Sequence, residues 1–352
     1  GTSWGAYSPA VTVTTKSTAT TITVVSSGGG ISGTDYTLSG GQFYAKASNN
    51  VSINASDIQT ALNSGNVVIA ADNVIIDAPI TWSSSRYLTL GNSTTSTVTI
   101  NKKITTSTNG SQLVISSPTY NLDVKNGASI QFTSAGTQYL NIGGVSYTLI
   151  KTEAQLVAAT ASTNYALAKP LTLATSYTTS PINVSYAAML DGLGNTIDSM
   201  KIGATTTERI GLINTLATGG VVRNLGVTNA DISLSSSNYR AGVIAGGSTG
   251  GTIEQVWSTG FIRTTTTNSS LSLGGLVGNV ESGTLNISKS WSSVNIDSST
   301  SGSGTALEQG GIIGGDELTV PQAHTLSGGS VNLSQVYATG TLKWASNSHR
   351  GI

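Results

Sequence analysis

The sequence predicts an all-β protein folded as a parallel β-helix, a stack of coils also called a β-solenoid. The chain of 352 residues is rich in Thr, Val and Ile and has only 6 Pro, a composition typical of strands. Its apolar residues stand in short alternating runs, which argues against a disordered chain. A glycine-containing unit also recurs through the second half, as expected for a stack in which each coil touches its neighbours.

The first half contains short alternating runs, each separated from the next by turn residues. Every second residue of a run is aliphatic, so one face of each strand points to a dry interior. Such short strands cannot fill a wide sandwich, but they suit one side of a coil, and they predict irregular coils over residues 51–150. The expected strands are Val51–Ile53, Val67–Ile69, Val74–Ile76, Leu88–Leu90, Val98–Ile100 and Leu113–Ile115.

The second half repeats one template: a glycine with small or aliphatic residues, then a turn and a strand. The repeats are separated by 31, 33 and 36 residues, counted from the anchor glycines Gly211, Gly242, Gly275 and Gly311. A phosphate-binding loop would occur once and lead into a helix, and a membrane-packing motif would need an apolar helix around it. We therefore expect these glycines at a tight corner of each coil, where a neighbouring coil leaves no room for a Cβ.

Two short helices are expected to decorate the coils. One follows Ile53, with a capping box from Ser56 to Gln59 and a closing Gly65. The other follows Ile150 and opens with the same kind of box, from Thr152 to Gln155.

The helix after Ile150 marks a boundary near residue 150, which divides the chain into three parts. Residues 1–50 form a strand-rich amino-terminal segment, residues 51–150 the irregular coils, and residues 151–352 the repeat region. Within the first part, Val11–Val25 is strand-like, and it is either a cap or a strand donated to a neighbouring subunit.

Composition excludes several classes of function. The chain has 16 basic and 16 acidic residues, so no basic face is expected for nucleic acid or an anionic membrane. It has no cysteine, which excludes disulfides, zinc–thiolate sites and thiol catalysis. No apolar run is long enough to span a bilayer. We expect no cofactor and no metal site, since no calcium-loop pattern is present. The start is no signal peptide, which indicates a mature protein or an excised piece.

The catalytic inventory is thin, and we expect no enzyme. His324 and His349 stand in polar, loop-like surroundings without a nucleophile motif. Paired carboxylates would be needed for a polysaccharide-acting β-helix enzyme. The candidates are Asp191 with Asp198 and Asp72 with Asp77. Asp-Gly is a common turn dipeptide, so we interpret these carboxylates as turn or surface residues.

Aromatic residues supply a binding hypothesis. Trp257, Trp291 and Tyr337 occupy equivalent strand positions in three repeats, between small or hydroxylated residues. Stacked coils would bring them into a ladder on one face. If that ladder is exposed, it could contact sugar rings. The alternative is that the three rings face inward or pack beneath the turns.

The order of motifs resembles the passenger of filamentous haemagglutinin-type exoproteins of two-partner secretion systems. The resemblance covers roughly residues 40–345 and rests on "VSINASDIQTALNSG" (51–65), "LNIGGVSYTLI" (140–150), "NYALA" (164–168) and "LDGLGNTI" (190–197). The four glycine-anchored repeats resemble GLUG-type repeats. The Asn-Pro-Asn motif of the secretion domain is absent, so the chain is similar to a downstream passenger segment.

The resemblance implies a right-handed parallel β-helix exported through an outer-membrane transporter of the two-partner type. It implies a non-enzymatic adhesin, secreted or held at the bacterial cell surface, that attaches to a host receptor or glycan, or to other cells in a biofilm. The main alternative is a structural subunit of a self-assembling extracellular filament or matrix, in which the partners are neighbouring copies of the chain.

Overall fold

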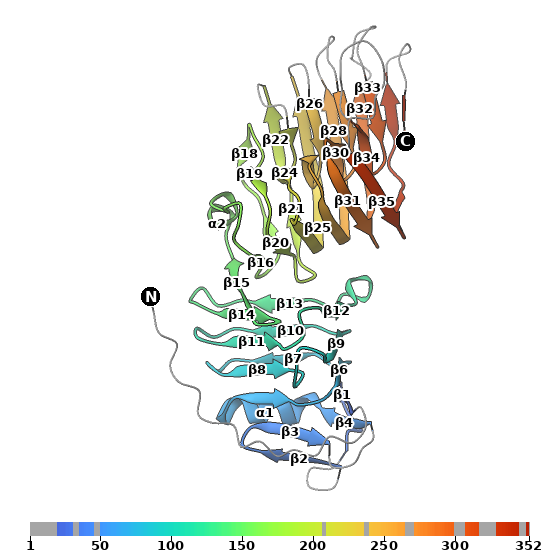
Figure 1. Cartoon of the computed structure of the whole chain (residues 1–352). Coiled ribbons are helices and arrows are strands. Elements are labelled where there is room, and N and C mark those ends of the chain that lie inside the picture. Colours follow the sequence, from blue (N-terminus) through green and yellow to red (C-terminus); the bar gives the residue numbers. More distant parts are fainter. Residues whose placement is uncertain are drawn as a thin grey trace.

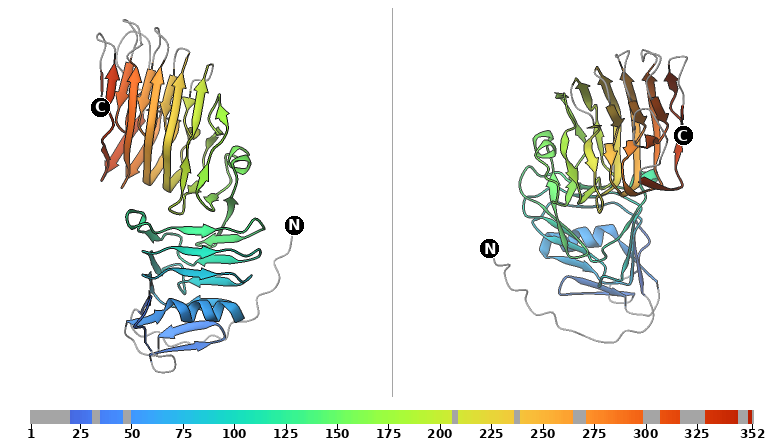
Figure 2. Two further views of the ribbon diagram at one scale, coloured as in Figure 1. Left: turned by 180° about the vertical axis from the view of Figure 1, so that it is seen from behind. Right: turned by 45° about the horizontal axis from the view of Figure 1, so that its top comes forward.

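The structure, a computed structural model, is almost entirely β, with strands paired mainly in parallel. It describes residues 20–30, 35–45, 50–205, 209–235, 239–264, 271–298, 307–316, 329–344 and 350–351. These form an N-terminal stack of strands up to residue 142 and a C-terminal stack from residue 165, and the strands of one stack run across those of the other (Figures 1 and 2). The all-β prediction is confirmed.

Three sheets build the N-terminal stack. Sheet 1 has the order β4 (Val51–Asn54), β1 (Thr21–Val25), β6 (Asn73–Ile76), β9 (Thr97–Ile100) and β12 (Asn121–Leu122). Sheet 2 is β7 (Ile80–Trp82), β10 (Ile104–Thr106) and β13 (Ile130–Phe132). Sheet 3 runs through β2 (Tyr36–Ser39), β3 (Gln42–Ala45), β5 (Val67–Ile69), β8 (Tyr87–Leu90), β11 (Gln112–Ile115) and β14 (Tyr139–Ile142).

The core of this stack consists of aliphatic columns that cross the strands. In sheet 1, Val24 pairs with Ile53 and Ile76, and Ile76 pairs with Ile100. All four side chains are fully buried. The in-register pairing therefore follows from the alternating pattern, because a shift of one residue would turn each aliphatic column to solvent.

The first strand of the chain lies inside sheet 1. β1 pairs in parallel with β4 on one side and with β6 on the other. Of the segment Val11–Val25, Thr21–Val25 thus forms a strand within its own chain, whereas residues 11–19 lie outside the described residues. Beyond β3, the antiparallel strand β2 ends sheet 3.

Helix α1 (Ala55–Ser64) packs against β7 and closes this end of sheet 2 (Figure 1). The predicted capping box at Ser56 is wrong: the N-cap is Asn54, and its side chain makes no capping hydrogen bond. That side chain is used elsewhere, since its Oδ1 accepts from the N–H of Gly29 and its Nδ2 contacts Asp57. The 3-10 helix η1 (Val124–Asn126) follows β12.

The two stacks are connected by β15 (Val145–Ile150), which pairs with β14 in antiparallel and with β16 in parallel. Helix α2 (Glu153–Val157) follows it, and the predicted capping box between Thr152 and Gln155 is confirmed. The buried core of the N-terminal stack extends across this junction, because Ala166, Ala168 and Leu193 of the C-terminal stack pack into it.

Sheet 4 is the largest sheet of the C-terminal stack. Its early strands are β16 (Tyr165–Leu167), β17 (Leu171–Thr172), β18 (Ser176–Tyr177), β20 (Met189–Asp191), β21 (Thr196–Asp198) and β22 (Lys201–Ala204). The later ones are β25 (Val221–Leu234), β28 (Gly251–Thr264), β31 (Gly283–Ser288), β32 (Trp291–Ser298), β35 (Gly329–Ser334), β36 (Tyr337–Ala338) and β37 (Leu342–Trp344).

Two narrower sheets complete the C-terminal stack. Sheet 5 is β19 (Ile182–Tyr186), β24 (Ile213–Leu216), β27 (Ala245–Ser248), β30 (Val277–Val280) and β34 (Ile313–Asp316). Sheet 6 is β23 (Arg209–Ile210), β26 (Tyr239–Gly242), β29 (Leu271–Gly274), β33 (Leu307–Gly310) and β38 (Arg350–Gly351). Each predicted repeat contributes to all three sheets. Its part of sheet 4 is one long strand in the first two repeats and is divided into two or three strands in the later ones.

The chain bends at the same place in each pass through sheet 4. The bend carries a residue with positive φ, which is uncommon outside glycine. On successive strands, four residues that precede the bend pair with one another and form a column: Arg223, Glu254, Ser288 and Ser334. The residue after each of them has the positive φ. The bend residues are Leu193, Asn224, Gln255, Lys289 and Gln335.

The anchor glycines lie where the chain turns from sheet 6 into sheet 5. A Cβ on Gly275 would overlap the carbonyl oxygen of Gly311 in the next pass. The strand register differs from the sequence alignment, because Gly242 pairs with Gly274 and Gly274 pairs with Gly310. Gly275 and Gly311 therefore lie one residue beyond the column formed by Gly242, Gly274 and Gly310. In each of these passes, two residues separate that column from the first residue of sheet 5.

A second glycine column was not singled out from the sequence. Gly246, Gly278 and Gly314 lie on sheet 5 and face the backbone of sheet 6 in the preceding pass. A Cβ on Gly278, for example, would lie 2.5 Å from the backbone nitrogen of Ala241. The two sheets therefore pack backbone against backbone. In "GLVG" (275–278), the first glycine lies against the next pass and the last glycine lies against the preceding pass.

Candidate functional site

The three predicted aromatic residues form a strip across sheet 4. Trp257 pairs with Trp291, and Trp291 pairs with Tyr337, so the three occupy one column on successive strands. The neighbours Val256 and Ser258 are fully buried, whereas Trp257 and Trp291 are half-buried and Tyr337 is 54% exposed. The strip, defined as Trp257, Trp291 and Tyr337, thus lies on the outward face and not in the interior.

The rings of the strip use part of their faces on the protein itself. Trp291 and Tyr337 stack with centroids 6.0 Å apart and an interplanar angle of 8°. The indole of Trp257 covers Gly226, its partner on β25, where any Cβ would collide with the ring. The strip therefore offers solvent mainly ring edges and the exposed side of Tyr337, which suits contact with a surface better than enclosure of a small ligand.

The rest of this face passes from hydroxyl groups to charges. Thr259 pairs with Ser293, and Phe261, which is 53% exposed, pairs with Asn295. Beyond them Arg263 forms an ion pair with Asp231. Lys343 lies 4.0 Å from Asp297 on the following strands. Alternation of sign from strand to strand avoids the repulsion that stacked like charges would cause.

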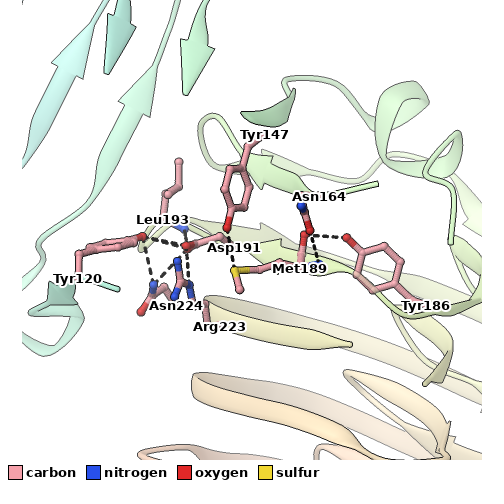
Figure 3. A network of polar contacts seen from close by, with 9 residues as sticks. All are labelled: Tyr120, Tyr147, Asn164, Tyr186, Met189, Asp191, Leu193, Arg223 and Asn224. Carbon is pink, nitrogen blue, oxygen red and sulfur yellow. Dashed lines mark hydrogen bonds and ion pairs between the residues drawn. The ribbon is translucent and has the colours of Figure 1, made fainter. Parts of the chain in front are cut away.

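Asp191, a candidate carboxylate for an enzyme, is instead the centre of a buried network (Figure 3). It is fully buried, and its Oδ2 accepts from Nε of Arg223 at 2.7 Å. Tyr120 of the N-terminal stack donates its hydroxyl at 3.0 Å, and Asn224 donates Nδ2 at 3.1 Å. The carboxylate also accepts the N–H of Leu193, which is at the bend.

The electrostatics of this network follow from its burial. Burial and the negative charge of Asp191 raise the pKa of Tyr120 well above its usual value, so the phenol stays neutral and donates. For Arg223, burial alone would lower the pKa, but the adjacent carboxylate outweighs it and the pKa is raised. The guanidinium also lies over the Tyr120 ring, 5.1 Å from its centroid. The ion pair is therefore a fixed contact within the C-terminal stack, and the Tyr120 hydroxyl links it to the N-terminal stack.

The other candidate carboxylates also have structural partners. Asp198 accepts hydrogen bonds from Thr228, Asn229 and Ser199, and these bonds, with that of Thr228 foremost, lower its pKa. Asp72 accepts from the N–H of Thr20, and Asp77 accepts from Asn101. Asp191 is fully buried whereas Asp198 is partly exposed, and each carboxylate is held by its own hydrogen-bond partners. His324 and His349 lie outside the described residues.

Sequence reasoning missed Tyr120, Arg223 and Asn224. They stand 71 and about 32 residues from Asp191, so no local spacing could join them. Within the described ranges, no group of three or more His, Cys, Asp or Glu is arranged to hold a metal ion. The described helices include none that is long and apolar enough to cross a membrane.

Comparison with known proteins yields one partial similarity. A stretch of 98 residues is 36% identical to halomucin of Haloquadratum walsbyi. The match covers 28% of this chain but spans only 1% of the length of halomucin. No protein-family model matches the chain, and no solved structure matches it.

Proposed function

We propose that the chain is a non-enzymatic segment of an extracellular, cell-surface adhesin, built as a right-handed parallel β-helix. The observation that carries the proposal is the aromatic strip, three rings held in register on the outward face of a stack of parallel strands. A stiff stack suits attachment, because it holds a contact surface at a set distance from the cell.

The β-helix assignment is supported by three features of the C-terminal stack. Each pass contributes to sheets 4, 5 and 6, the positive-φ bend recurs in sheet 4, and aliphatic columns fill the interior. The two glycine columns support the resemblance to GLUG-type repeats, since both contacts recur from pass to pass. On this assignment, export uses an outer-membrane transporter of the two-partner type.

A cell-surface or secreted location is favoured by the same evidence. The chain has no cysteine and only 9% charged residues, and its sequence is rich in Ser and Thr. The similarity of 98 residues to halomucin agrees with this location. The balanced charge gives no reason to expect nucleic acid as a partner, which leaves a host receptor, a glycan or another copy of the chain.

Attachment of the purified chain to host and bacterial cells tests the proposal. Beads coated with the chain are expected to bind, and the double variant Trp257→Ala, Trp291→Ala is expected to bind less at equal coating density. Val157→Ala, at an exposed apolar residue of helix α2 away from the strip, serves as the control. If the strip variant binds as well as the unchanged chain and only its melting temperature falls, the strip is structural and not adhesive.

A filament or matrix subunit is the second candidate, because strand β35, in the last described pass of sheet 4, exposes its apolar side. Val331 and Leu333 pair with the buried residues Leu285 and Ile287, yet they are 38% and 53% exposed. In the described part of the chain β35 pairs on one side only. Molecular mass measured by light scattering over a range of concentrations decides this alternative: a constant monomer removes it.

A further inference from the structure

A second aromatic array lies on the outward face of sheet 3, in the N-terminal stack. Gln112 pairs with Tyr87 on one side and with Tyr139 on the other, so the three form one column. Their strands β8, β11 and β14 are neighbours in the N-terminal stack (Figure 1). Asn66 extends the column, since its Oδ1 accepts the N–H of Tyr87 at 3.1 Å. Leu88 and Leu140, the next residues along, are buried, which places the column on the outside.

This array differs from the strip in that its rings do not stack on each other. Tyr87 and Tyr139 are 43% and 48% exposed and are separated by the strand that carries Gln112. Two strand spacings amount to about 9.6 Å, too far for ring contact. Within the described part of the chain, neither phenol hydroxyl nor the Gln112 carboxamide makes a hydrogen bond. The column therefore alternates amide side chains with exposed aromatic rings, and the Gln112 amide is free of hydrogen bonds within the described residues.

That alternation matches the chemistry of a sugar chain. The C–H face of a pyranose ring packs on an aromatic ring, while amides bind the hydroxyl groups at its edge. In an extended β-linked chain, successive units are turned over, so equivalent faces recur every second unit. The length of two such units is close to the two-strand spacing between the tyrosines.

The surroundings favour an uncharged chain. The residues that flank the column are Val68, Thr89, Val114 and Asn141 on the same outward face, and Arg86 is the one charged residue adjacent to either tyrosine in the sequence. We infer that Asn66, Tyr87, Gln112 and Tyr139 form a binding site for an uncharged, extended β-linked polysaccharide that runs across the strands. The inference rests on the proposed attachment function and names a ligand class for it.

The test is depletion binding of the whole chain to insoluble polysaccharides. Amorphous cellulose and β-mannan are the extended β-linked probes, and amylose is the helical α-linked control. We expect binding to at least one β-linked probe and little to amylose. Tyr87→Ala and Tyr139→Ala should each weaken binding about tenfold, because each removes one stacking platform. Tyr87→Phe and Tyr139→Phe keep the ring and should bind nearly as the unchanged chain does.

Unchanged binding by both alanine variants, equal binding to amylose, or no binding to either β-linked probe would overturn the inference. Circular dichroism and melting temperature verify that the variants are folded, and exposed substitutions of this kind should leave both unaltered. The experiments distinguish failure of this site from failure of the proposed attachment function. If cell attachment is kept when the tyrosines are replaced but lost when the strip is replaced, the attachment function holds and the glycan site is wrong. If the chain binds glycan but does not attach to cells, the glycan site holds and the attachment function is wrong.

Discussion

The carboxylate of Asp191 and the guanidinium of Arg223 form a buried ion pair, Oδ2 to Nε 2.7 Å, at the junction of the two stacks. They occupy paired positions on β20 and β25. Tyr120 adds a hydrogen bond from the N-terminal stack, and Gln255 donates to the carbonyl of Leu122 nearby. The junction is therefore held by polar contacts as well as by the apolar residues of the C-terminal stack that pack into the N-terminal core.

Asp191→Asn should destabilise the protein by about 3–5 kcal/mol, because it leaves the buried Arg223 without a counter-charge. Urea unfolding followed by circular dichroism measures the change. Asp231→Asn is the matched control, since it breaks the exposed pair with Arg263 and should cost less than about 1 kcal/mol. Equal losses in the two variants would show that the buried pair does not stabilise the junction.

Gly278→Ala should destabilise the protein by about 1–3 kcal/mol or more, because the new methyl group meets the backbone of Gly246 and Ala241. The control is Gly203→Ala, also in a strand, where a Cβ meets nothing within 4 Å. Thermal unfolding of the two variants compares them directly. A Gly278→Ala protein as stable as the Gly203→Ala protein would contradict the close packing of sheets 5 and 6.

Gly226→Ala should displace the indole of Trp257, because the added Cβ collides with the ring that covers this glycine. The expected result is a red shift of tryptophan emission as the indole becomes more exposed. The same substitution made together with Trp257→Phe isolates the source of the signal. If the shift persists in that background, it comes from another tryptophan and the contact is not the cause.

Stability below about pH 5 should depend on Glu153. Hydrogen bonds, foremost that from the Tyr177 hydroxyl and with others from Ala174 and Thr175, lower the pKa of Glu153 to about 2. Since the folded-state pKa lies below that of the unfolded chain, the contribution is complete above the unfolded value of 4.5 and is lost as the pH falls toward 2.

Urea midpoints between pH 5 and pH 2.5 measure this dependence. Glu153→Gln should flatten the pH dependence, and Tyr177→Phe should reduce it by removing the main hydrogen bond. A slope that is the same in both variants as in the unchanged chain would show that other carboxylates account for the acid sensitivity.

The predictions that held rest on local patterns. The alternation at Val74–Ile76 and Val98–Ile100 predicted strands with one buried face, and both are strands of that kind. The box from Thr152 to Gln155 predicted a helix start correctly. The similar box at Ser56 failed, because Asn54 is available one residue before the helix and its side chain is engaged with Gly29 and Asp57.

The sites could be predicted only in part. Equivalent positions in the repeats were enough to place Trp257 beside Trp291, since a repeat brings like residues into one column. Repeats do not reveal whether the rings face out, which depends on the bend at Gln255 two residues earlier. Tyr87 and Tyr139 stand in the irregular half, where no repeat signalled that Gln112 would join them.

The sequence by itself determined the all-β character, the short strands and the recurrence of glycine at the turns, because alternation and spacing act within a few residues. Only the tertiary structure decided the strand register, the second glycine column and the joining of Tyr120 to Asp191 and Arg223. Those relationships join residues that are dozens of positions apart, so they depend on which strands pack together. At the junction, a buried charge needs a partner close by in space, and that partner is far away in the sequence.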